Sequence, residues 1–245
     1  SRKYHCVVTN PPYLGKGFCD VLKNYIIANY PNSKSDTMAT FMERCLAFSV
    51  DNGKVGMINM QSWMFLSSYE DLRIDLLEKY NVDSLLHLGP HVFDEISGEV
   101  VQCVSFVLAK HKPNTDGGIF YRLLDGRNCS EKENSFLRKE NGFYNIKQYN
   151  FEKISGSPIG YWVSGVILNA FSKYPTISSM FSPATGLQTG DNNKFIRLWF
   201  EVEDRLKSLK WFPLVNGGEN RKWYGNFQNY IYWYKDGEDI KKCKG

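Results

Sequence analysis

The tetrapeptide Asn10-Pro11-Pro12-Tyr13 is the part of this 245-residue sequence whose residue types and spacing are best suited to chemistry. An amine attached to a ring is a poor nucleophile because its lone pair is delocalised. The Asn10 side-chain oxygen and the Pro11 carbonyl form an acceptor pair that can bind both amine hydrogens and draw the nitrogen toward an electron-rich, pyramidal state. Such a nitrogen can attack an electrophilic methyl group without a prior general base. The motif therefore indicates methylation of a conjugated amine.

The prolines and the tyrosine give this acceptor pair its geometry. Pro11 and Pro12 have a fixed φ, and Pro12 pushes Pro11 into an extended conformation that keeps the Pro11 carbonyl out of a regular ladder. The Tyr13 ring can lie on a planar base that has been turned out of a helix, replacing the stacking lost there. The structural alternative is a strand-terminating turn with a core tyrosine.

The elements that must position this motif follow from hydrophobic periodicity and turn residues. The sequence predicts, in chain order, a strand over 4–9, a helix capped by Asp36 with Gly53 just past its end, a strand over 54–60, a helix beginning near Ser67, and strands over 82–89 and 100–109. The last two strands are joined by a polar loop without a helical pattern, which predicts a hairpin. This order predicts an α/β fold: a partial Rossmann-like sheet, parallel with an antiparallel edge hairpin. Ligands of such sheets bind beyond the carboxyl ends of the strands, where Asn10 lies.

Composition changes along the chain predict its domain organisation. Residues 1–160 contain the sheet pattern, with the polar stretch 130–141 interpreted as loop, and residues 161–182 predict a helical linker. Residues 183–245 hold several Gly-Asn and Gly-Asp turn clusters and four of the six tryptophans, which indicates a second, loop-rich unit.

With these residues in view, the chain resembles the N6-adenine DNA methyltransferases, whose target-amine loop is [DNS]PP[YF]. It resembles the catalytic half of the Eco57I-like methylases in the segments NPPY, KVGMINMQSWMF, SSYEDLR and VDSLLHLG. It resembles BREX phage-defence methyltransferases of the PglX type in the segments GLQTGDNNKFIRLW and WFPLVNGGENRKWYGN. The resemblance implies that the tetrapeptide holds and stacks a flipped adenine of double-stranded DNA. It also implies that residues 1–160 are the substrate-side half of a catalytic domain and that residues 183–245 begin a target-recognition domain.

The resemblance further implies S-adenosylmethionine as the cofactor, bound mainly by a glycine-rich loop and an acidic residue upstream of the tetrapeptide. Only nine residues precede Asn10 in this chain. Gly15 with Gly17, and Gly186 with Gly190, are interpreted as flexible turns rather than substitutes for that loop. We therefore expect a fragment that is inactive alone, with an exposed sheet edge that the missing N-terminal half or self-association covers.

Ser62, Trp63 and Phe65 follow the second predicted strand, and the resemblance places them at the border of the base pocket. The alternative is that Trp63 and Phe65 pack between helix and sheet.

The tail carries basic residues interleaved with aromatic ones, a composition suited to phosphate contact and stacking. The predicted DNA-binding residues are Lys194, Arg197, Arg221 and Lys222. The alternative is that the neighbouring aromatic residues belong to a core.

Composition excludes several other classes of protein. The formal charge of +4 is mildly basic, the 42% hydrophobic and 15% aromatic content excludes disorder, and no apolar run approaches the length that spans a bilayer. Six scattered cysteines without a CxxC pair predict no metal site, and His87 and His91 are interpreted as loop histidines. The first residues lack the apolar region of a signal peptide, which predicts a cytoplasmic location and no membrane partner.

Two other functions remain open at this point. Similar loops methylate RNA bases or protein glutamine, although a small protein-methylating enzyme would not need the long aromatic tail. The missing cofactor loop also fits a non-catalytic module that contributes DNA specificity or interaction without turnover.

Overall fold

The computed structural model describes residues 2–15, 17–93, 101–114, 116–183, 186–215, 217–218, 220, 222–223 and 225–243. The chain divides into two compact units, Ser1–Thr176 and Ile177–Gly245, each of which is described by itself. The assignment of 1–160, 161–182 and 183–245 to a catalytic half, a linker and a recognition domain stays a prediction.

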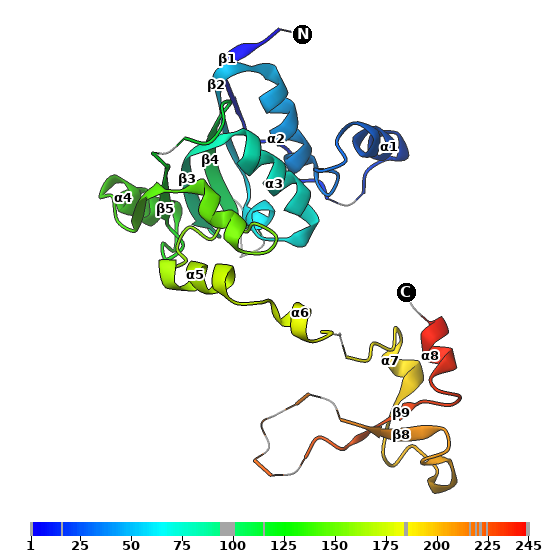
Figure 1. The fold of residues 1–245 in the computed structure, drawn as a ribbon. Coiled ribbons are helices and arrows are strands. Elements are labelled where there is room, and N and C mark those ends of the chain that lie inside the picture. The colour runs from blue at the N-terminus through cyan, green and yellow to red at the C-terminus, as the bar shows by residue number, and fades with distance from the viewer. Residues whose placement is uncertain are drawn as a thin grey trace. The chain divides into compact units, whose positions relative to one another are not determined.

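A six-stranded mixed sheet forms the centre of the first unit (Figure 1). Its strands are β1 (Tyr4–Thr9), β2 (Ser49–Met60), β3 (Asn81–Gly89), β4 (Cys103–Ala109), β5 (Gly118–Arg122) and β6 (Gly142–Ile146), in the spatial order β1-β2-β4-β3-β5-β6. β1 pairs with β2 in parallel and β3 with β5 in parallel, whereas β4 is antiparallel to both β2 and β3. The carboxyl ends of β1, β2, β3 and β5 therefore lie along one edge, which we call the carboxyl edge.

The predicted mixed α/β sheet is confirmed, and one detail of it is corrected. The β3–β4 hairpin does not form the edge of the sheet, because β4 lies between β2 and β3. β4 (CVSFVLA) is buried along most of its length, and such a continuous apolar run is stable only with neighbours on both sides. The antiparallel edge is formed by β6, which pairs with β5.

The helices of this unit are α1 (Asp20–Asn29), α2 (Thr37–Phe48), α3 (Glu70–Lys79), α4 (Cys129–Leu137) and α5 (Gly165–Lys173), with 3-10 turns η1 (Gln61–Met64), η2 (Ser67–Tyr69) and η3 (Gln148–Lys153). α2 and α3 cover one face of the sheet (Figure 1). Their apolar residues form a single core with Val55 and Met57 of β2 and Phe106 of β4. Burial of this stripe, rather than helix propensity, holds both helices in place.

The opposite face of the sheet is open over β1, β2 and β4. Val8 is 76% exposed there, and a shallow hollow of about 330 Å³ runs from Asn10 across Gly56 and Ile58 to Val107. Over β5 this face is covered by α4, whose Phe136 ring meets the Tyr121 ring edge-on at 5.1 Å.

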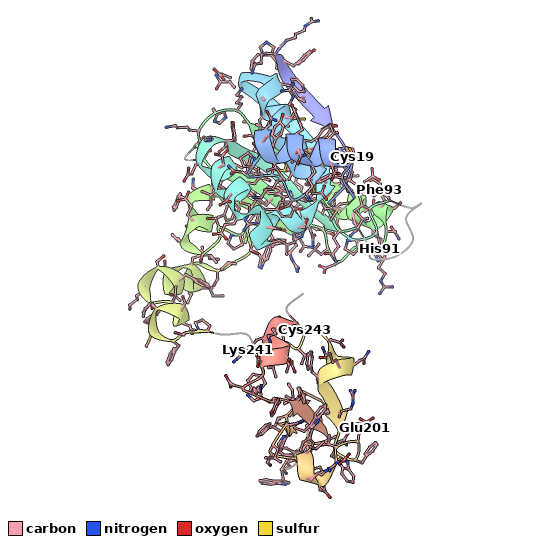
Figure 2. All side chains as sticks on the ribbon, turned by 90° about the vertical axis from the view of Figure 1, so that its right-hand side faces the viewer. Cys19, His91, Phe93, Glu201, Lys241 and Cys243 are labelled. Atoms are coloured by element: carbon pink, nitrogen blue, oxygen red, sulfur yellow. The ribbon has the colours of Figure 1, made fainter. Side chains whose placement is uncertain are left out.

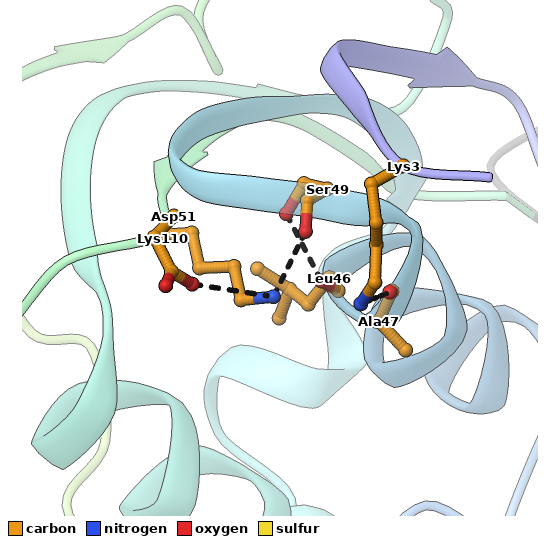
Figure 3. Close-up of polar contacts among 6 residues, drawn as sticks. All are labelled: Lys3, Leu46, Ala47, Ser49, Asp51 and Lys110. Carbon is orange, nitrogen blue, oxygen red and sulfur yellow. Dashed lines mark hydrogen bonds and ion pairs between the residues drawn. The ribbon is translucent and has the colours of Figure 1, made fainter. Parts of the chain in front are cut away.

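β2 begins earlier than the sequence predicts. α2 ends at Phe48, and Gly53 lies inside the strand, where a Cβ would be 2.8 Å from the Val50 carbonyl oxygen. The junction is tied to its neighbours: Lys110 donates to the Ser49 carbonyl at 2.9 Å and Lys3 donates to the Ala47 carbonyl (Figure 3). Gly53 is therefore needed for close approach of backbone, not as a helix stop.

Three further predictions of secondary structure are corrected. The stretch 130–141, interpreted as loop, contains α4, whose cap Asn128 accepts from the Glu131 amide at 2.9 Å. α1 was not predicted. The helix near Ser67 exists, but it starts as a 3-10 turn, and its α-helical part has no side-chain cap.

The second unit contains a three-stranded antiparallel sheet in the order β7-β9-β8. Its elements are α6 (Ile177–Met180), α7 (Asn192–Phe195), β7 (Ile196–Leu198), η4 (Asp204–Leu206), β8 (Trp211–Leu214), β9 (Asn229–Tyr232) and α8 (Glu238–Lys242). Phe195, Ile231 and Ile240 form its small core. α8 carries Lys241, labelled in Figure 2, whose ammonium lies 5.7 Å from the centre of the Trp233 ring. Among the described residues of the chain, no helix is long and apolar enough to cross a bilayer.

Candidate active site

The NPPY loop follows directly from the end of β1 at the carboxyl edge. Asn10 is exposed and borders the hollow, whereas Pro11 behind it is buried. The side-chain amide is therefore accessible to a ligand while its backbone is anchored. A buried asparagine without a cavity would have excluded an acceptor role.

The N-terminus of α2 holds the loop in shape. Thr37 Oγ1 donates to the Pro12 carbonyl at 2.7 Å, and the Leu14 amide donates to Asp36 Oδ1 at 3.1 Å. Asp36 Oδ1 also accepts from the Met38 amide at 2.9 Å, which confirms the predicted N-cap. Within the described residues the Pro11 carbonyl accepts no hydrogen bond. One carbonyl of the proline pair is thus used to fix the loop and the other is left free to accept.

Tyr13 connects the loop to β4. Its hydroxyl donates to Asn10 Oδ1 at 3.2 Å, which orients the amide oxygen and still leaves that oxygen a second lone pair. Burial, together with the neighbouring Cys103 thiol, raises the pKa of Tyr13 well above its ordinary value. The tyrosine is therefore a neutral hydrogen-bond donor at neutral pH.

A row of polar side chains continues from the loop along the carboxyl edge. Gln102, next to Cys103, accepts from the Gln61 amide at 2.8 Å through its carbonyl, and the two side-chain amides are also hydrogen-bonded. Gln61 Oε1 lies 2.7 Å from His87 Nε2, and His87 Nδ1 lies 3.2 Å from the Tyr161 hydroxyl. The row connects the residue before β4 and the residue after β2 with His87 of β3.

His87 is a buried strand residue and not the loop histidine that we expected. It is 3% exposed in β3. Burial, with the charges of Arg122 and Lys132 adding to it, lowers its pKa to about 4. Because the Gln61 side chain donates to Gln102 through its nitrogen, its oxygen faces His87, so the neutral ring carries its proton on Nε2. His91, by contrast, lies beyond the end of the strand, as expected.

The three residues that the sequence placed at the base pocket lie in different surroundings. Trp63 is 1% exposed, donates to Asn59 Oδ1 at 3.0 Å and packs in the core, which is the alternative that the sequence left open. Ser62 Oγ is buried beside the Tyr69 hydroxyl. Phe65 is half-buried at the carboxyl edge, with its ring centre 5.9 Å from that of His87.

A buried arginine supports this edge from behind. Arg73 of α3 is 1% exposed, and its guanidinium donates to the carbonyls of Trp63, Leu66 and Gly156 at 2.9, 2.6 and 2.6 Å. Burial lowers the pKa of this group, which its basicity tolerates without loss of charge. The loop after β2 is thereby tied to Gly156, which lies 83 residues after Arg73.

The described residues do not fit a cradle for S-adenosylmethionine. A Cβ at Gly15 would lie 2.9 Å from Asp36 Oδ2, so this glycine allows close approach to a carboxylate, and Gly17 adopts a positive φ of 86° as a turn does. Asp36 itself is committed to the loop and the helix. Nor do the described residues contain a cluster of metal-ligating side chains.

The predicted DNA-binding residues are distributed over the second unit. Lys194 is exposed on α7 with its ammonium 5.0 Å from the Phe195 ring centre, and Lys222 is exposed beside the Trp223 ring at 5.6 Å. Arg197 is half-buried in β7, where its guanidinium donates to the carbonyls of Asn193 and Ile196. The fourth predicted residue, Arg221, lies outside the described residues.

The first unit therefore has a mixed α/β fold in which the NPPY loop follows a parallel strand at the carboxyl edge. A solved structure of a type I restriction-modification system is similar over 74% of this chain and 41% of that chain, with a TM-score of 0.51 and 17% identity. That likeness concerns the fold.

Residues 1–93 match the model of the Eco57I restriction-modification methylase family. The whole chain is 41% identical to the adenine-specific methyltransferase BrxX of Escherichia coli O9:H4 (strain HS), and 98% of it is 39% identical to the adenine-specific methyltransferase PglX of Lacticaseibacillus casei (strain Zhang). The chain spans 21% and 22% of the length of these two relatives.

Proposed function

We propose that this chain is the substrate-side part of an enzyme that methylates the N6 amine of a flipped adenine in DNA, in phage defence or restriction-modification. The observation that carries the proposal is the loop geometry. Asn10 is exposed, the Pro11 carbonyl accepts no hydrogen bond within the described residues, and Thr37 fixes the Pro12 carbonyl. The relatives named adenine-specific methyltransferases support the choice of adenine.

In this mechanism the chain's own residues bind and orient the amine. Asn10 Oδ1 and the Pro11 carbonyl each accept one N–H, which increases the electron density on the nitrogen that attacks. Tyr13 holds the Asn10 amide through its hydroxyl and offers its ring to the purine. Both acceptors are positioned before the substrate arrives, so little reorganisation opposes the reaction.

S-adenosylmethionine, when bound, supplies the electrophilic methyl group. Because the described residues do not fit its cradle, we propose that other parts of the full-length enzyme hold the cofactor and cover the open face over β1, β2 and β4. Double-stranded DNA is the proposed partner, with Lys194, Arg197, Arg221 and Lys222 as contacts to it. A cytoplasmic location is part of the same proposal.

The test is Asn10→Ala in the full-length enzyme. Loss of one acceptor should lower kcat by at least about 100-fold, as loss of one preorganised transition-state partner does elsewhere, while DNA affinity changes little. Methyl transfer from radiolabelled cofactor and a gel-shift assay measure the two quantities. Asn134→Ala, an exposed asparagine of α4, is the matched control and should match wild type.

Two outcomes would contradict this proposal. Retention of methylation by Asn10→Ala would remove the loop from the chemistry. Absence of turnover in the intact wild-type enzyme on adenine-containing DNA would favour a non-catalytic specificity module or, if RNA or protein glutamine is methylated instead, a different acceptor.

A further inference from the structure

An exposed tryptophan stands at the far end of the carboxyl-edge row from the NPPY loop. Trp162 is 42% exposed although it follows the buried Tyr161. One face of its indole stacks on His87, with ring centres 5.9 Å apart and an angle of 26°, and its edge meets Phe65 at 5.8 Å. Because His87 covers one face, the exposed area belongs to the rest of the ring.

The ring is held rigidly by its surroundings. Tyr161 packs edge-on against Trp162 at 4.8 Å and is fixed by its hydroxyl on His87. The backbone just before it is attached to the loop after β2, because the Ile159 amide donates to the Met64 carbonyl at 3.0 Å and Arg73 bridges both segments. A ligand that stacks on Trp162 would therefore not have to order it first.

A positive charge lies beside this aromatic surface. Arg122 of β5 is in register with His87 of β3, so their side chains leave the sheet on the same face. Its positive charge adds to the effect of burial in lowering the pKa of His87. Within the described residues this guanidinium has neither a hydrogen bond nor an ion pair. A flat aromatic surface and a free guanidinium together suit one ligand: a nucleotide with its base unstacked.

We propose that Trp162 is a stacking platform for a second DNA base, distinct from the target adenine, and that Arg122 contacts the phosphate of that nucleotide. The proposal rests on the proposed function, because the target adenine is assigned to Tyr13 at the other end of the row. When the adenine is flipped, its neighbour in the same strand and its pairing partner in the opposite strand each lose a stacking contact. Trp162 replaces that stacking.

The test uses the full-length enzyme and duplexes that carry its recognition site. Trp162→Ala should weaken DNA binding about 5- to 100-fold, the usual range for loss of one base–aromatic stack, and Trp162→Phe should recover most of the affinity. Tyr149→Ala, which removes an exposed aromatic side chain of the same unit, is the control and should bind as wild type does. Arg122→Gln, which leaves the aromatic stack in place, should reduce affinity and lessen its salt dependence.

The base itself is identified by substituting abasic sites one position at a time. An abasic site at one position other than the target adenine should weaken DNA binding by the wild-type enzyme. The same abasic site should not change the affinity of Trp162→Ala. The proposal is overturned if Trp162→Ala, with a wild-type thermal transition, binds within twofold of wild type, if no position is coupled to Trp162, or if the coupled position is the target adenine. These outcomes are independent of Asn10→Ala, which decides the proposed function.

Discussion

The two units of the chain differ in what they do with their aromatic side chains. In the first unit Trp63, Phe106 and Phe120 are at most 2% exposed, and they form the core that supports the carboxyl edge. In the second unit Trp199 and Trp223 are 56% and 89% exposed. The first unit has a packed aromatic core behind the carboxyl edge, whereas the second has a small core and exposes tryptophans beside basic residues. Precise chemistry needs the former, and adaptable contact with a long polymer needs only the latter.

The largest effect in this comparison is expected from Arg73→Met. Three backbone carbonyls would lose their donor at a buried site, so the free energy of unfolding should fall by about 3 kcal/mol. Urea unfolding of the full chain, followed by tryptophan fluorescence, measures it. Arg44→Met removes an exposed arginine of α2 and serves as the control. A loss below about 1 kcal/mol in Arg73→Met would show that the first unit does not depend on this tie.

An intermediate effect is expected from Thr37→Val, which removes the donor to the Pro12 carbonyl while keeping the shape of the side chain. The loop would lose its anchor, and kcat should fall about tenfold, or about 1.4 kcal/mol. Thr40→Val, on the same helix, loses a bond to the Ser33 carbonyl instead and should keep its kcat. Both variants should lose about 1 kcal/mol of stability. Equal kcat values in the two variants would show that the hydrogen bond from Thr37 to the Pro12 carbonyl does not contribute to catalysis.

The smallest effect is expected in the second unit, from Lys222→Ala. An exposed phosphate contact contributes weakly, so DNA affinity should fall two- to fivefold, and the slope of log affinity against log salt should decrease by about 1. Stability should not change. Lys79→Ala, which removes an exposed lysine of the first unit, should leave the slope unaltered. A loss of stability in Lys222→Ala would mean that this surface is structural and that the contrast between the units is weaker than described.

The sequence was sufficient where a feature depends on neighbours along the chain. Such features involve residues within a few positions of one another. The structure has the strand before Asn10, the stiff Pro11-Pro12 pair and the Asp36 cap. The first and third predicted strands also agree with β1 and β3 within one residue. The start of β2 at Ser49 was missed, because Ser49 pairs with Tyr4 of β1 before the irregular stretch from Asp51 to Gly53, and regular pairing resumes at Lys54.

The sequence was insufficient where distant segments meet. His87 lies 74 residues from Tyr161 and 26 from Gln61. Burial lowers its pKa, with the charges of Arg122 and Lys132 adding to the effect, and so keeps it neutral. No local pattern marks Gln61 or Trp162 as members of one edge. The regular spacing of a helix or strand shows which residues are buried, but it does not show which buried or half-buried residues meet.

The amino-acid sequence by itself therefore determined the NPPY loop, since its shape depends on four consecutive residues whose backbone angles the prolines restrict. Only the tertiary structure decided what stands beside that loop. Insertion of β4 between β2 and β3 brings Cys103 to Tyr13 and Gln102 to Gln61, and Arg73 adds a segment from beyond residue 155. The physical reason is that strand order and long-range hydrogen bonds are set by the packing of the whole core, to which every element contributes and which no single segment encodes.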